Sequence, residues 1–89
     1  MGNGDARVRV DEVLRAIEEV VRGELGLKVT VLPESELLKD LRLDSLSLMT
    51  LVVALEDRFL VALEEDDAAH VTTVSDLADL IVRRVREAA

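Results

Sequence analysis

The serine at position 45 is the residue whose type and setting best suit it for chemistry. It lies between an aspartate and a leucine, in Asp44-Ser45-Leu46. No charged residue occurs from Ser45 to Leu55. An aspartate ahead of an apolar run is typical of a helix start, where its carboxylate accepts hydrogen bonds from free amides. The pattern predicts an accessible hydroxyl at the head of an uncharged helix.

The chain lacks the other groups that catalysis or metal binding would need. It has no cysteine and one histidine, His70, so neither a thiolate nucleophile nor a multi-histidine metal centre can form. The acids from Glu64 to Asp67 lack the ligand spacing of a calcium loop, and no glycine-rich phosphate loop follows a strand. We therefore predict no catalysis and no bound metal, with His70 solvated near the end of a short helix.

The amino-acid composition indicates which kinds of molecule the protein could bind. The chain has 89 residues, of which 49% are hydrophobic, enough for one small core. Its net charge of −8 disfavours nucleic acid and anionic lipid and favours basic protein partners. The single aromatic residue, Phe59, cannot form a base-stacking platform. With no secretory signal and no uncharged run long enough to span a bilayer, we expect a cytoplasmic monomer without membrane insertion.

Three stretches have the apolar spacing of helices. Residues 8–25 carry one amphipathic stripe, which Gly26 would end. Residues 45–59 form the second stretch, and the third starts at a capping box formed by Thr73 and Asp76. The inward face of this third helix would consist of Val74, Leu77, Ile81 and Val85.

A long connection separates the first two helices. Residues 27–43 are predicted to form an ordered loop, because an isolated strand there would have no partner. Leu37, Leu38 and Leu41 are expected to anchor this loop in the core.

These elements define one domain. The acidic stretch at residues 66–70 is expected to form one short helix. We predict an all-α fold, a small four-helix bundle with three main helices, one short helix and a long first loop. A flexible leader at residues 1–7 would precede the domain at residues 8–87.

The second helix is apolar on nearly every side. Its inward stripe would consist of Leu48, Leu51, Leu55 and Phe59. A second side is apolar through Leu46, Met49, Val52 and Val53. In so small a domain, such a helix either lies at the centre or carries a docking face.

Residues 37–74 resemble discrete acyl carrier proteins, the small four-helix carriers of fatty-acid and polyketide synthesis. The mark of that family is an Asp-Ser-Leu sequence at the start of the second helix, matched here by residues 44–46. Further blocks match in order and spacing: Asp40-Leu41, the helix end Ala54–Phe59, the acidic turn Glu64–Asp67 and the run Val71–Val74. The first helix agrees only in its pattern.

The resemblance implies that Ser45 receives a 4′-phosphopantetheine arm from coenzyme A, transferred by a separate Mg²⁺-dependent phosphopantetheinyl transferase. The arm would hold acyl groups as thioesters and pass them between acyl-loading, chain-extending or tailoring enzymes. A chain without cysteine needs such a cofactor to supply the sulfur, and a serine without a neighbouring base needs a partner to activate it. Arg42, Asp44 and Leu46 would be the neighbours of the attachment site.

The resemblance also implies roles for the surface and the core. Partner enzymes would recognise a neutral upper part of the second helix and an acidic lower part, comprising Ser47, Thr50, Val53, Glu56, Asp57, Glu64, Glu65, Asp66 and Asp67. Leu48, Leu51, Leu55 and Phe59 are expected first of all to pack in the core, and the resemblance implies that the same core can open to shelter an acyl chain. Since acids are usual where Ser47 and Thr50 stand, we expect docking that is more hydrophobic and favour a dedicated pathway over general fatty-acid synthesis.

Two further departures from the family pattern matter. Arg42 stands where glycine is usual, and we expect it to pair with the phosphate of the arm or with Asp44. Glu64 stands where proline is common, which predicts a less rigid linker.

Two other functions remain open. A peptidyl or aminoacyl carrier is disfavoured by Leu43-Asp44 and by the acidic charge. In a non-carrier helical adaptor, Ser45 would only cap a helix and the apolar face would bind the partner.

Overall fold

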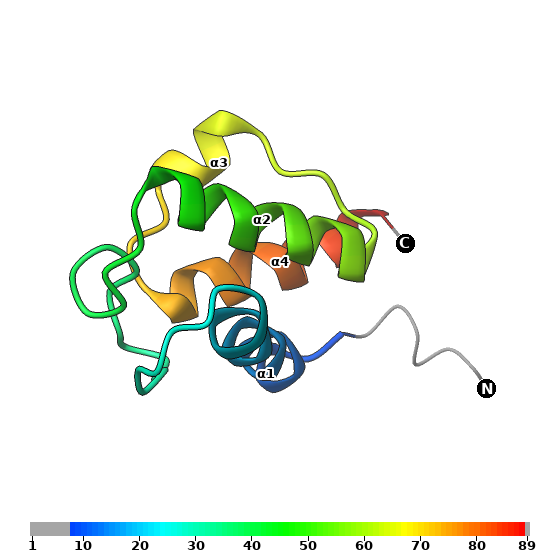
Figure 1. Cartoon of the computed structure of the whole chain (residues 1–89). Helices are drawn as coiled ribbons and strands as arrows, with labels where there is room; N and C mark the ends of the chain where they lie inside the picture. The colour runs from blue at the N-terminus through cyan, green and yellow to red at the C-terminus, as the bar shows by residue number, and fades with distance from the viewer. Residues whose placement is uncertain (1–7, 89) are drawn as a thin grey trace.

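A computed structural model describes residues 8–88, in which the chain forms helices and no strands. In chain order the elements are α1 (Val10–Glu19), η2 (Val20–Glu24), α2 (Ser45–Phe59), α3 (Glu65–Ala69) and α4 (Val74–Ala88). Figure 1 shows α2 and α4 running side by side, with α1 seen nearly end-on below them and α3 beyond the other side of α2. The predicted all-α bundle is confirmed, while the predicted leader at 1–7 lies outside the described residues.

The first helix begins at Val10, later than predicted, and ends in a π-helical turn that the apolar spacing did not reveal. In this turn the amide of Leu25 donates to the carbonyl of Val20, at 3.0 Å and five residues back. Both Val20 and Val21 are buried. Gly26 follows with φ of 67°, a conformation that glycine adopts without a steric penalty, so its predicted role as the stop is confirmed.

The long loop is fixed against the start of α4. The amide of Leu37 donates to the carbonyl of Thr72 at 3.0 Å, and the amide of Val74 donates to the carbonyl of Ser35 at 2.9 Å. These bonds form an isolated bridge rather than a sheet. The loop is therefore ordered, and it holds the segment that leads into α2.

The prediction that Leu38 anchors the loop was wrong, because this side chain is 62% exposed. The loop makes one helix-like turn, in which the amides of Asp40 and Leu41 both donate to the carbonyl of Glu36. Residues four apart in such a turn share a face, so Leu37 and Leu41 both point inward at 2% and 1% exposure. Leu38, one position on, points to solvent.

The core lies between α1, α2 and α4. Its largest fully buried side chains include Ile17 from α1, Leu51 and Leu55 from α2, and Leu77 and Ile81 from α4. The predicted inward face of α4 is buried throughout, from Val74 at 0% to Val85 at 9% exposure.

The starts of α3 and α4 are set by local hydrogen bonds. At α4 the amide of Asp76 donates to Thr73 Oγ1 at 3.0 Å, and the amide of Thr73 donates to Asp76 Oδ2 at 3.1 Å, which confirms the capping box. α3 begins one residue earlier than predicted. The reason is that Asp67 Oδ2 accepts from the amide of Glu64 at 3.1 Å and so places the helix start at Glu65.

Candidate functional site

The start of α2 is built by Asp44. Its backbone is extended, and its Oδ1 accepts a hydrogen bond from the amide of Ser47 at 2.7 Å. The predicted N-cap is thus confirmed. This backbone hydrogen bond from Ser47 holds the pKa of Asp44 below its usual value, so the carboxylate stays charged to a lower pH than an ordinary aspartate.

Ser45 is the first residue of α2, and its side chain is exposed. The chain has four serines, at 35, 45, 47 and 75. Ser35 is buried, and Ser47 and Ser75 are half-buried, so Ser45 is the one that presents its hydroxyl freely. The amides of Ser45 and Leu46 donate to no acceptor within residues 8–88. They leave the positive end of the helix open to an anion.

Arg42 lies just ahead of this helix start, with φ of 58°. The side chain is exposed and forms no ion pair with any residue that the structure describes. The predicted alternative of pairing with Asp44 is therefore not realised. The physical reason is that the Asp44 carboxylate turns towards the amide of Ser47.

One side of α2 presents an unbroken row of apolar side chains to solvent. Leu46 is 74% exposed, Met49 64% and Val53 57%. The spacings of three and four residues place them on one face of the helix. We call this row the apolar face of α2, and it corresponds to the second apolar side predicted from the sequence. Its exposure is unusual for large apolar residues in a domain of this size.

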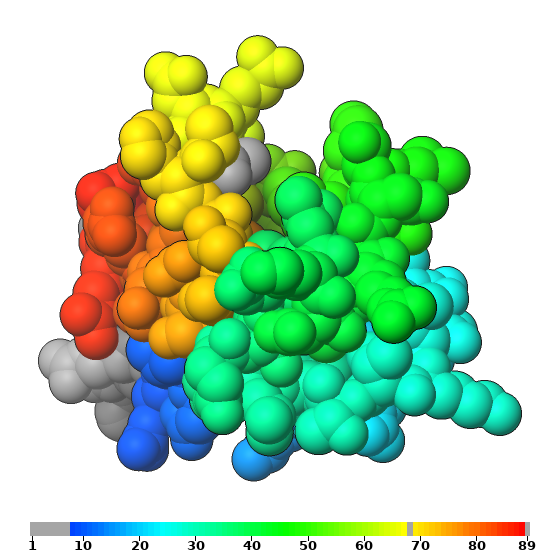
Figure 2. All heavy atoms as spheres, turned by 90° about the vertical axis from the view of Figure 1, so that its left-hand side faces the viewer, coloured from blue at the N-terminus to red at the C-terminus, as the bar shows by residue number. Residues whose placement is uncertain are grey.

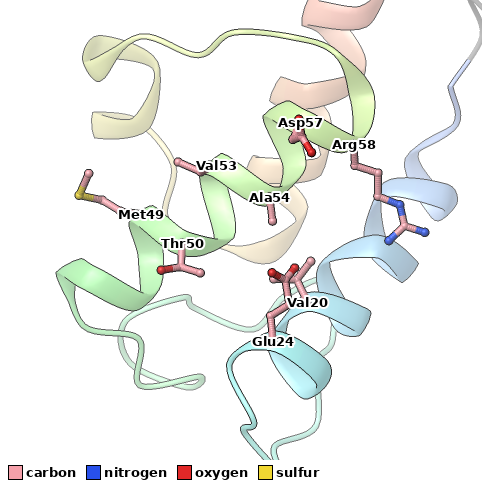
Figure 3. Close-up of a pocket in the computed structure, with 8 residues that line it drawn as sticks. All are labelled: Val20, Glu24, Met49, Thr50, Val53, Ala54, Asp57 and Arg58. Carbon is pink, nitrogen blue, oxygen red and sulfur yellow. The ribbon is translucent and has the colours of Figure 1, made fainter.

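A groove of about 630 Å³ lies between α2 and the π-helical turn η2. Figure 3 shows Thr50, Ala54 and Arg58 along the wall nearest η2, opposite Val20 and Glu24. The outer edge consists of Met49, Val53 and Asp57. Sequence reasoning missed Val20 and Glu24, because no signal in the spacing indicates a π turn or its orientation towards α2.

A second groove, of about 250 Å³, lies on the other side of the apolar face. It is lined by Leu48, Met49, Val52, Val53, Glu56, Leu63, Glu64 and Glu65. Of the residues predicted to shelter an acyl chain, Leu48 lines this groove. Leu51 and Leu55 are fully buried behind it, and Phe59 is half-buried against the core.

Two of the acids predicted for partner recognition have partners within the fold. Glu56 Oε2 accepts from the amide of Leu63 at 2.7 Å and so holds the linker after α2. Both carboxylate oxygens of Asp67 accept from Arg84 Nη2, at 2.6 and 2.5 Å, which ties α3 to α4. These hydrogen bonds from Arg84 lower the pKa of Asp67.

The remaining predicted recognition residues lie nearer to solvent. Asp57, Glu64, Glu65 and Asp66 are exposed. The hydroxyl of Thr50 donates to the carbonyl of Leu46 at 2.9 Å, which leaves the methyl group as its outward contact surface. In Figure 2 the segments around the start of α2 (green) and around α3 (yellow) stand out on the same face, with a hollow between them.

His70 directly follows α3 and is exposed, as predicted, with Nδ1 2.8 Å from the carbonyl of Asp66. No set of three or more potential metal-ligating side chains gathers anywhere in residues 8–88. Within the same range, no helix has the length and apolar character needed to cross a membrane.

Comparison with known proteins places this arrangement in a family. The sequence profile described as "Phosphopantetheine attachment site" matches residues 15–81. An acyl carrier protein from Myxococcus xanthus is 39% identical over 72 residues, which cover 80% of this chain and 91% of that protein. One from Micrococcus luteus is also 39% identical over 72 residues, covering 80% and 89%.

The fold agrees with these sequence matches. The structure resembles the crystal structure of an acyl carrier protein from Thermotoga maritima, with a TM-score of 0.81 and 22% identity over 100% of both chains. The fold and the profile together define a helical domain with a phosphopantetheine attachment site. The chain belongs to the acyl carrier protein family.

The cofactor of this domain is 4′-phosphopantetheine, and the head of α2 fits it. The group joins its carrier through an anionic phosphate. At the head of α2 the structure combines an exposed hydroxyl on Ser45 with two unengaged amides at a helix N-terminus. Arg42, three residues ahead of Ser45 in the chain, adds an exposed cation.

Proposed function

We propose that Ser45 carries the 4′-phosphopantetheine arm and that the protein shuttles acyl groups between the enzymes of a biosynthetic pathway. The single observation that carries this proposal is the position of Ser45, the exposed serine at the open head of α2 within the matched family segment. When bound, the arm supplies the terminal thiol on which acyl groups are held as thioesters.

The attachment step is a phosphoryl-type transfer onto the hydroxyl of Ser45. The oxygen of Ser45 forms a new bond to the phosphorus that bears the pantetheine part of coenzyme A. The bond from that phosphorus to the nucleotide part breaks, and the hydroxyl proton leaves to a base. The hydroxyl of Ser45 donates no hydrogen bond to a side chain that could act as a base in residues 8–88. We therefore assign the base and the Mg²⁺ to a phosphopantetheinyl transferase.

The chain's own residues prepare this step by holding the hydroxyl in place. Asp44 fixes the first turn of α2 through Ser47. Leu41 and Leu43, both buried, hold the incoming loop. The serine is thus presented on a rigid helix end rather than on a mobile loop, which lowers the cost of positioning it in a partner's active site.

We assign partner docking to the apolar face of α2 and the adjoining groove at η2. Leu46, Met49 and Val53 offer apolar contact. Glu24 on the η2 wall of the groove and Asp57 on its outer edge have no ion-pair partner in the described chain, whereas Arg58 is neutralised by Glu19 at 2.7 Å. The surface therefore suits a partner segment that presents an aliphatic side chain beside a lysine or arginine.

An acyl chain would find its shelter in the groove of about 250 Å³ beside α2. Leu48 and Val52 give it an apolar wall, and Leu51 and Leu55 form the core behind that wall. The linker on the opposite side is fastened through Leu63 and Glu56, so widening the groove would require this hydrogen bond to break.

The neutral upper part of α2 supports a dedicated acyl or polyketide-type pathway over bulk fatty-acid synthesis. Ser47 and Thr50 add no charge around Ser45. A carrier of aminoacyl groups would use the same attachment chemistry, and loading assays with acyl and aminoacyl donors would distinguish them.

The test is to incubate the purified protein with coenzyme A, Mg²⁺ and a permissive phosphopantetheinyl transferase, and then to measure its intact mass. We expect a gain of one phosphopantetheinyl group in the unaltered protein and none in Ser45→Ala. If the unaltered protein gains no mass, the carrier function fails. The exposed apolar face of α2 would then favour a helical adaptor.

A further inference from the structure

The backbone at Arg42 adopts a conformation that suits glycine better than arginine. Arg42 and Leu60 are the two non-glycine residues with positive φ in residues 8–88, at 58° and 57°. On either side of Arg42, Leu41 and Leu43 are buried, at 1% and 4% exposure. The left-handed turn between them lets both leucines point inward, and it sends the side chain of Arg42 outward. The fold needs this turn but gains no packing from an arginine there.

The charge of Arg42 is also without a partner in the described chain. The two acids within two residues of it, Asp40 and Asp44, both accept from backbone amides, those of Glu36 and Ser47, at 2.7 Å each. Each carboxylate therefore stabilises a turn of the backbone instead of the guanidinium. The chain has a net charge of −8, and yet this cation close to Ser45 in the sequence has no acidic partner among the described residues. It is therefore available to bind an incoming anion.

We propose that Arg42 binds the phosphate that joins the arm to Ser45. The inference rests on the proposed attachment at Ser45. Three residues span at most about 11 Å along the backbone, and the arginine side chain and the serine-linked phosphate would extend across this span from its two ends. The guanidinium fork matches two phosphate oxygens. The amides of Ser45 and Leu46 donate to no described acceptor and add two further donors to the same group. Arg42 is thus a positioning residue, which fixes the base of the arm relative to α2.

The experiment compares two glycine variants, each with and without the arm. Arg42→Gly and Leu60→Gly relieve the same strain, that of a non-glycine residue at positive φ, but only Arg42→Gly removes a charge. Each protein is loaded to completion, as checked by intact mass, and its melting temperature is compared with that of its unloaded form. The ³¹P resonance of each loaded protein is recorded as a second, independent measurement.

We expect both variants to melt higher than the unaltered protein before loading. After loading, Leu60→Gly should still melt higher than the loaded unaltered protein. Arg42→Gly should no longer do so, because its phosphate has lost the cation that it would otherwise bind. The ³¹P resonance should shift in Arg42→Gly and stay in place in Leu60→Gly.

The inference would be overturned if the two loaded variants exceeded the loaded unaltered protein in melting temperature by the same amount and the ³¹P resonance of Arg42→Gly were unchanged. Slower loading of Arg42→Gly with those two measurements unchanged would overturn it in favour of a contact between Arg42 and the transferase. If the unaltered protein itself takes up no arm, the attachment proposal fails, and the assignment of Arg42 fails with it.

Discussion

The two long helices α2 and α4 start in opposite ways. At α4, Thr73 and Asp76 cap each other, and the loop adds the carbonyls of Ser35 and Pro33 as acceptors for the amides of Val74 and Ser75. Every donor of that first turn is engaged within the fold. At α2 one carboxylate, that of Asp44, caps the helix, and the amides of Ser45 and Leu46 stay open. Both starts contain a serine near an aspartate, yet only one leaves donors for an incoming group.

The comparison shows that an Asp-Ser pair is not by itself the functional signal. Ser75 is half-buried and its amide is bound to the loop, so it contributes to the fold. Ser45 is exposed and precedes a helix whose apolar residues face outward as well as inward. A functional helix start is recognised by the donors it leaves open and by the surface next to it.

The largest expected effect on stability is a difference between two leucines, Leu77 in the first turn of α4 and Leu46 in the first turn of α2. Leu77 is 2% exposed and Leu46 is 74% exposed. Leu77→Ala should lower the free energy of unfolding by about 2–5 kcal/mol, through lost burial and a residual cavity. Leu46→Ala should change it by no more than about 0.5 kcal/mol but slow acyl transfer to partners. Urea unfolding followed by circular dichroism measures the free energy of unfolding of both variants. Equal losses of that free energy would contradict the contrast between the two leucines.

Acid should weaken the capped starts and the link between α3 and α4 together. Hydrogen bonds lower the pKa values of Asp44, Asp67 and Asp76 below the ordinary 3.8. Their contribution to stability is complete above 3.8 and is lost as the pH falls through the lower pKa values of the folded state. Melting temperatures should therefore drop as the pH falls below 3.8, and Asp67→Asn should make that drop shallower. An unchanged acid profile in Asp67→Asn would show that the Arg84 contact contributes nothing.

A smaller effect is expected from the cap of the closed start. Thr73→Ala removes the acceptor for the amide of Asp76 and should cost about 1 kcal/mol. It should leave the loading of Ser45 unchanged, since the capping box lies at the other helix. Chemical unfolding gives the first quantity and intact mass the second. Loss of loading in the folded Thr73→Ala variant would contradict the separation of the two starts.

The smallest expected effect concerns the backbone before and after α2. In the unloaded protein, Arg42→Gly and Leu60→Gly should each raise the free energy of unfolding by about 0.5–1 kcal/mol. Relief of the left-handed conformation gives about 1–2 kcal/mol, and the greater freedom of glycine in the unfolded chain takes back about 0.5–1 kcal/mol. Thermal unfolding measures the gain. Destabilisation by either variant would mean that the side chain packs in a way its exposure does not suggest.

The sequence was sufficient to predict what local rules control. Asp44 and the uncharged run behind it predicted α2 with its observed bounds, Ser45–Phe59. The spacing of Thr73 and Asp76 likewise predicted the start of α4. Caps and helical periodicity act within a few residues, so they can be read directly from the chain.

Features that depend on contacts between distant segments could not be predicted. The pair Arg84–Asp67 joins residues 17 apart, and Arg58–Glu19 joins residues 39 apart. The π turn that places Glu24 in the groove depends on packing against α2, and the periodicity of a regular helix does not indicate it. The left-handed turn at Arg42 follows from two leucines that the core pulls inward on either side.

The most direct test of the central claim is to identify which of the four serines carries the arm. The loaded protein would be digested and its peptides fragmented by mass spectrometry, with Ser45→Ala, Ser47→Ala and Ser75→Ala treated in parallel. We predict the phosphopantetheinyl group on Ser45, full loading of Ser47→Ala and Ser75→Ala, and no loading of Ser45→Ala. An arm found on Ser47 or Ser75, or full loading of Ser45→Ala, would contradict the assignment of the open start of α2 as the attachment site.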